Sequence, residues 1–274
     1  MCPGATYARE VSRHLMDILS SGDAEDLIAY LVAESKIPGH KANLELIEAF
    51  ARSVREFAAA DTEDCRILWD LCVELACISP EDAPTDDPNE LLSICGVRGV
   101  GAIGTISPEC VKVALRKLAV NSEDPRWRIR DAVALGLRDL LARYQDVTLF
   151  ELNGWLDSGS WLSMRAVAAG IADPNLLSDP ELAEAALRLH RKILIRVYTA
   201  GERDSEAFHA LRKTLGHTLS QVVAAIPSGG FEYLRQVSTL EDQDMRWIVR
   251  ESLKDSQIEG RYPETVRHIR AQME

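Results

Sequence analysis

The stretch that decides the fold is Asp124-Pro-Arg-Trp-Arg-Ile-Arg-Asp131, because the chain repeats it as Asp244-Met-Arg-Trp-Ile-Val-Arg-Glu251. Six of the eight positions match in identity or in close chemistry. A weaker third copy begins at Trp161, 34 residues after Trp127. Self-similarity of this kind indicates a repeat architecture, in which each short unit buries its apolar face against its neighbours.

The segments around these copies have the apolar period of amphipathic helices. In residues 43–60 one face is apolar and the opposite face is charged. The apolar face holds Leu44, Ile47, Ala51 and Val54, and the charged face holds Glu45, Glu48, Arg52 and Arg55. Residues 204–226 show the same period, and no Asn-Gly hairpin signal interrupts the chain. We therefore expect an all-α protein of roughly fourteen helices joined by short turns.

Helix starts and one longer break define the organisation along the chain. Asn43, Ser107-Pro108, Asp124-Pro125 and Asp179-Pro180 each combine a capping side chain with the start of a helical pattern. Residues 79–88 hold three prolines and four acids, which excludes a helix there. We expect a single helical repeat domain over 1–274, with an acidic N-terminal region over 1–78, a loop over 79–88 and a repeat region over 89–274.

Asp124, Arg130 and the small residues Ala132 and Gly136 at helical spacing resemble the HEAT-repeat family. This resemblance implies an α-α superhelix, a HEAT/armadillo-like solenoid of stacked helical pairs. It also implies polar contacts in which the Asp of one repeat meets the Arg of a neighbour. The usual role of such a superhelix is to bind a macromolecular partner along its curved surface.

The repeated Trp–Arg pair also resembles, more weakly, the HEAT-like repeat proteins of DNA alkylation repair. That resemblance implies a concave basic surface for duplex DNA, with aromatic residues and an acid near the damaged base. Trp155, Asp157 and Trp161 are the nearest such arrangement in this sequence, although their spacing departs from the family pattern. They are the alternative catalytic candidates, for a DNA glycosylase-like activity.

Charge and cysteine content bound the partners and the compartment. Residues 1–90 hold 19 acidic and 7 basic side chains, so the whole net charge of −12 lies in the first third. Such an acidic end repels nucleic acid and anionic membranes, which counts against the DNA alternative.

No apolar run is long enough for a membrane span. The six cysteines form no CxxC pair, and we interpret them as reduced thiols of a cytoplasmic protein.

The other candidate motifs for ligand binding or catalysis lack the sequence context that their chemistry requires. Residues 99–104 match GxGxxG but lack the preceding strand of a dinucleotide site, so we interpret these glycines as close-packing positions. The histidines and the pair Cys72 and Cys77 lack metal-ligand spacing, and we expect neither a metal nor a cofactor. No nucleophile motif appears. The sequence therefore favours a non-catalytic protein, although catalytic groups can converge from distant repeats.

Two basic stretches remain as candidate contact surfaces. Residues 112–143 hold eight cations against four acids, and residues 188–213 hold seven against three. On neighbouring repeats such stretches can form one concave face for an acidic peptide or for phosphates. We predict an interaction module that binds a protein or peptide partner in this groove, with nucleic acid as the alternative. The predicted contact residues are Arg126, Arg128, Arg130, Arg188, Arg191, Arg196 and Arg250.

Overall fold

The computed structural model describes residues 3–39, 41–157 and 159–273; Cys2 and His40, considered above, lie outside the described residues. The described residues form helices joined by short connections and contain no β-strand, which confirms the all-α class. Contacts divide the chain into two compact units, one ending at Thr148 and one beginning at Leu149. The single domain over 1–274 stays a prediction.

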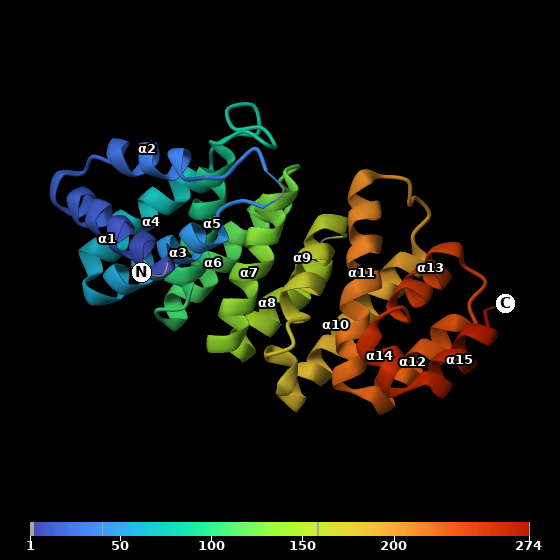
Figure 1. Ribbon diagram of the computed structural model, residues 1–274. Coiled ribbons are helices and arrows are strands. Elements are labelled where there is room, and N and C mark those ends of the chain that lie inside the picture. Colours follow the sequence, from blue (N-terminus) through green and yellow to red (C-terminus); the bar gives the residue numbers. More distant parts are fainter. Residues whose placement is uncertain (1–2, 40, 158, 274) are drawn as a thin grey trace. The chain divides into compact units, whose positions relative to one another are not determined.

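The first unit contains seven helices and the start of an eighth (Figure 1). These helices are α1 (Pro3–Ser21), α2 (Glu25–Ala33), α3 (Leu44–Ala60), α4 (Thr62–Ala76), α5 (Glu90–Gly104), α6 (Pro108–Ser122), α7 (Trp127–Arg143) and α8 (Gln145–Asp157). Helices α1, α3, α5 and α7 contact one another in this order. Helix α4 packs against α3 and α5, and α6 packs against α5 and α7. The unit therefore consists of stacked helical pairs, as predicted.

Helix α5 is the centre of the first unit, and every one of its residues is buried. Its glycines allow close approach of the neighbouring helices. A Cβ added at Gly101 would lie 2.8 Å from Cα of Gly136 in α7, and one added at Gly96 would lie 2.3 Å from the backbone nitrogen of Ala76 in α4. Contacts this short exclude a side chain at either position. The GxGxxG stretch is thus a close-packing segment inside a helix, as predicted.

The second unit repeats the arrangement around two long helices, α10 and α11. Its elements are α9 (Trp161–Ile171), the 3-10 helix η1 (Leu176–Ser178), α10 (Pro180–Thr199), α11 (Glu206–Ala225), α12 (Pro227–Ser238), α13 (Gln243–Ser252), α14 (Ser256–Arg261) and α15 (Pro263–Ala271). Helices α9, α11 and α13 contact one another in this order. Helix α10 packs against α9 and α11, and α12 packs against α11 and α13. Within the described residues, no helix is long and apolar enough to cross a membrane.

Most of the predicted helix starts are confirmed. The side chains of Asn43, Ser107 and Asp179 cap α3, α6 and α10 by accepting from backbone N–H groups of the first turn. The start at Asp124 is wrong, because α7 begins only at Trp127. The Asp124 carboxylate accepts a hydrogen bond from the backbone N–H of Arg126 at 2.8 Å, which holds a turn ahead of the helix.

Candidate functional site

A buried arginine links the three helices that share one face of the first unit. The Arg98 side chain of α5 is only 2% exposed. Its guanidinium donates to Glu48 of α3 at 3.0 Å and to Asp139 of α7 at 2.9 Å. Because both carboxylates keep contact with solvent, Arg98 forms the floor between two polar walls. Arg98 was not among the residues predicted from the sequence, although a lone cation in an otherwise uncharged helix body was a usable signal.

Beside Arg98, a pocket of about 710 Å³ opens between the C-terminal halves of α3, α5 and α7. We call it the basic pocket. Its charged lining residues are Glu48, Arg52, Arg55, Glu56, Arg98, Asp139 and Arg143, and its uncharged floor includes Ala102, Thr105 and Ile106. Arg52, Arg55 and Arg143 are exposed. The charged face that the sequence predicts for residues 43–60 therefore forms one wall of a pocket.

The same face continues toward the N-terminal ends of these helices as an apolar cleft of about 220 Å³. The cleft and the basic pocket share Glu48 and Arg98 in their linings. The apolar lining of the cleft consists of Ala42, Leu44, Ile47, Ile94, Trp127, Ala132 and Leu135. Leu44 is 56% exposed and Trp127 is 43% exposed, so two large apolar side chains remain in contact with water. Other large apolar side chains are also exposed, and these two differ from them in lining one cleft together.

Arg128 supports this cleft and is not a free contact residue. Its guanidinium pairs with Asp86 at 2.8 Å and with Glu90 at 2.9 Å, and it lies 4.4 Å from the Trp127 ring centroid. Glu90 is fully buried, and burial raises the pKa of its carboxyl although Arg128 opposes this effect. Arg128 therefore orients the Trp127 ring at the mouth of the cleft.

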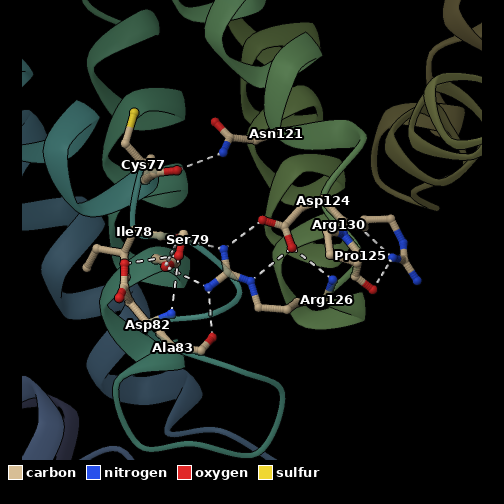
Figure 2. A network of polar contacts seen from close by, with 12 residues as sticks. Cys77, Ile78, Ser79, Asp82, Ala83, Asn121, Asp124, Pro125, Arg126 and Arg130 are labelled. Carbon is tan, nitrogen blue, oxygen red and sulfur yellow. Dashed lines mark hydrogen bonds and ion pairs between the residues drawn. The ribbon is translucent and has the colours of Figure 1, made fainter.

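Arg126, also predicted to bind a partner, is buried with its guanidinium occupied (Figure 2). It donates to the backbone oxygens of Ile78 and Ala83, each at 2.9 Å, and to the Asp124 carboxylate at 2.7 Å. These bonds attach the acidic loop 79–88 to the start of α7. The prediction that Arg126 is a contact residue is corrected here, because no donor of its guanidinium is left facing solvent.

We expect Arg126→Met to lower the free energy of unfolding of the first unit by about 2 kcal/mol, because two buried carbonyl oxygens lose a charged donor. Hydrogen exchange measured by mass spectrometry should show faster exchange across residues 79–88. Arg66→Met is the matched control, since its ion pairs with Glu63 and Asp70 lie on the exposed face of its own helix, α4. Unchanged protection of the loop in Arg126→Met would contradict the assignment.

Arg130 belongs to the first unit, where it donates to the backbone oxygens of Asp124 and Pro125, each at 2.7 Å. The other predicted arginines lie in the second unit. Arg188 and Arg196 are exposed on α10, and Arg188 pairs with Glu184 at 3.6 Å. Arg191 is half-buried, with its guanidinium 4.9 Å from the Tyr233 ring centroid. Arg250 is exposed and donates to the backbone oxygen of Met273 at 3.1 Å. The predicted contact residues of this unit that are open to solvent are thus Arg188, Arg196 and Arg250.

The alternative catalytic candidates do not form an open site. Trp155 is 9% exposed and belongs to the core. The exposed Asp157 carboxylate pairs with Lys192 of α10 at 2.9 Å. Trp161 packs edge-on against the buried Phe208, with ring centroids 5.3 Å apart. A flipped base stacks on an accessible aromatic face, and the buried ring of Trp155 does not offer one.

The second unit has its own pocket of about 550 Å³ between α11 and α13. Trp247, the counterpart of Trp127, lines it, with the Arg212 guanidinium 4.6 Å from its ring centroid. Arg212 also pairs with Asp244 at 2.6 Å. Here the Asp of one repeat does meet the Arg of a neighbouring helix, as the resemblance implied. At the first copy, Asp124 instead pairs with Arg126 of its own turn.

The remaining chemistry of the described residues is sparse. They contain no group of three His, Cys, Asp or Glu side chains that could hold a metal ion. Cys72 and Cys95 are buried free thiols, and burial raises the pKa of both. High thiol pKa values keep cysteines protonated and unreactive. Of the other described cysteines, Cys77 is exposed and Cys65 and Cys110 are partly exposed.

Comparison with known proteins adds little to this geometry. No protein-family model matches the chain, and no curated protein matches it. Among solved structures, the chain is similar to a designed armadillo repeat protein at 15% identity and a TM-score of 0.30, covering 83% of this chain and 98% of that chain. It is also similar to an engineered protein at 18% identity and a TM-score of 0.33, covering 84% and 98%. Because these TM-scores are low, the fold is described from the helices and their contacts and not from these structures.

Proposed function

We propose that this chain is a non-catalytic helical-repeat binding module, whose first unit binds an extended segment of a partner protein. The observation that carries the proposal is the adjoining pair of pockets on α3, α5 and α7. One pocket is apolar with an exposed Trp127, and the other is lined by Arg52, Arg55 and Arg143. We call the two pockets together the α3–α5–α7 groove.

The groove sets the length and polarity of the segment that fits. Leu44 and Arg55 are eleven residues apart on α3, which at 1.5 Å per residue separates the two ends by about 16 Å. An extended chain covers that distance in about five residues. The segment that fits best therefore carries a bulky apolar residue and, about five residues away, an acidic one.

We expect a fluorescein-labelled decapeptide with one Leu and one Glu at this spacing to bind with micromolar affinity in a fluorescence-anisotropy titration. Trp127→Ala should weaken that binding by about tenfold, because it removes the exposed anchor of the cleft. Phe150→Ala is the matched control, since Phe150 is an exposed aromatic residue outside the groove. Equal losses in both variants, or no binding at any Leu–Glu spacing from two to seven residues, would overturn the proposal.

The nucleic-acid alternative has less support from the geometry. Arg126 and Arg128 hold internal carboxylates and carbonyls, and the acidic first third of the sequence opposes a polyanion. A labelled DNA duplex in the same titration separates the two functions. Tighter binding to the duplex than to the peptide, falling steeply with salt, would replace the peptide proposal with the DNA one.

A further inference from the structure

The basic pocket holds more positive charge than its own acids neutralise. Arg98 pairs with both Glu48 and Asp139, so these three side chains together carry a charge of −1. Within the described residues, Arg52, Arg55 and Arg143 form no ion pair with any acid, and neither does Glu56. The lining as a whole holds four arginines and three carboxylates, so the pocket carries a net charge of +1, and three of its guanidinium groups have no acid paired with them.

These three arginines stand on two walls of the pocket. Arg52 and Arg55 are one helical turn apart on the exposed face of α3, and Arg143 lies in the last turn of α7. Helix α5, which contacts both, supplies the floor with the uncharged Ala102 and Thr105. A ligand above this floor can therefore meet guanidinium groups from both sides, while Glu48, Glu56 and Asp139 line the same walls.

From this arrangement we propose that the basic pocket is a subsite for a phosphorylated side chain of the bound segment; the inference rests on the proposed function. A phosphorylated serine carries a charge of about −1.5 to −2 near neutral pH, which is opposite in sign to the net charge of the pocket. Guanidinium forks bind phosphate oxygens in pairs, a geometry that a lysine cannot supply. Phosphorylation of the partner then controls its binding.

If these arginines had a purely structural role, we would expect a different result from replacing them. The C-terminal ends of α3, α5 and α7 lie at this side of the groove, and cations there offset the partial negative charge of helix ends. If that were their only role, replacing them would lower thermal stability and leave the preference for phosphate unchanged. Binding and thermal unfolding are therefore both measured on every variant.

The test uses three labelled decapeptides that differ at one position, five residues from the Leu: serine, glutamate and phosphoserine. We expect the full-length protein to bind the phosphoserine peptide at least about tenfold more tightly than the serine peptide, with the glutamate peptide between them. Arg52→Gln and Arg143→Gln should each reduce this preference. Trp127→Ala should weaken all three peptides by the same factor, and Arg188→Gln should change nothing.

The outcomes separate the phosphate subsite from the proposed function. Equal binding of the serine and phosphoserine peptides overturns the phosphate subsite and leaves the proposed function standing. Failure of all three peptides to bind overturns the proposed function itself. If inorganic phosphate at the concentration of the peptide displaced the phosphoserine peptide, the pocket would be a site for free phosphate, and the proposed phosphopeptide subsite would be overturned. A preference retained in both arginine variants would also overturn the proposal, whatever their thermal stability.

Discussion

Gly96→Ala is expected to lower the free energy of unfolding of the first unit by about 3 kcal/mol or more, the largest effect of a single methyl group in this chain. The added Cβ would lie 2.3 Å from the backbone nitrogen of Ala76 and 2.7 Å from the backbone oxygen of Cys72. Both atoms belong to the α4 backbone, which cannot rotate away as a side chain can. Helix α4 must move off the central helix α5, and the core between them opens.

Urea unfolding followed by far-ultraviolet circular dichroism measures this change, and two other glycines serve as controls. Gly99→Ala should lower the free energy of unfolding by less than Gly96→Ala does, because the added Cβ meets the Cys72 Sγ, a side-chain atom that can shift. Gly154→Ala should raise stability by about 0.5–1 kcal/mol, since nothing lies within 4 Å and alanine favours the helix. If Gly96→Ala costs no more than Gly99→Ala, the close backbone approach of α4 and α5 is wrong.

Features of the fold that depend on local sequence could be predicted from the sequence alone. Asn43, Ser107 and Asp179 cap helices because a side chain two or three residues from an unbonded N–H acts without help from the tertiary structure. The apolar period places the core residues of α3 for the same reason. The failure at Asp124 is instructive, because its carboxylate is occupied by Arg126 and does not cap α7.

The candidate site depends on distant segments of the chain and could not be predicted. An arginine-rich stretch looks like a contact surface, but whether it faces water depends on what covers it. Loop 79–88 and its neighbours supply the carbonyls of Ile78 and Ala83 and the carboxylate of Asp86, which bind Arg126 and Arg128. The arginines that stay exposed in the groove, Arg52 and Arg143 among them, lie in the charged face and the basic stretch that the sequence predicts, but the sequence does not show that their helices flank α5.

The internal repeat was a better guide to the faces of the helices than to their ends. Trp127 is the first residue of α7, whereas Trp247 is the fifth residue of α13. Both nevertheless line a pocket with a guanidinium over the ring. The arginine comes from the neighbouring residue in one copy and from α11 in the other. Trp127 is 43% exposed and therefore does not pack in the core between the helices.

The second unit is expected to lose up to about 3 kcal/mol of stability as the pH falls from 6.5 to 4, because of His190 in α10. This side chain is fully buried. Its Nδ1 lies 2.8 Å from the backbone oxygen of Ala186, which can only accept, so Nδ1 carries the proton. Its Nε2 then accepts from the Thr218 hydroxyl at 2.9 Å. Burial lowers the pKa of His190 to about 4, because the charged imidazolium is poorly solvated there.

The sign follows from proton uptake by the two states. An unfolded histidine binds a proton near pH 6.5, and folded His190 binds one only near pH 4, so the unfolded state holds more protons between these values. The contribution to stability is complete above pH 6.5 and decreases as the pH falls toward 4. His190→Gln removes this titration, so its free energy of unfolding should depend less on pH over this range, by up to one proton.

Comparison of wild type with variant cancels the titration of the carboxylates that both share. His217→Gln is the matched control, because His217 lies on the exposed side of α11, one residue before Thr218. This variant reports the loss of an exposed histidine alone, and its profile is the reference for His190→Gln. An NMR titration of the His190 ring gives the folded pKa directly. A midpoint near 6.5, or parallel pH profiles for wild type and His190→Gln, would show that the ring reaches water and that α10 does not pack against α11 as described.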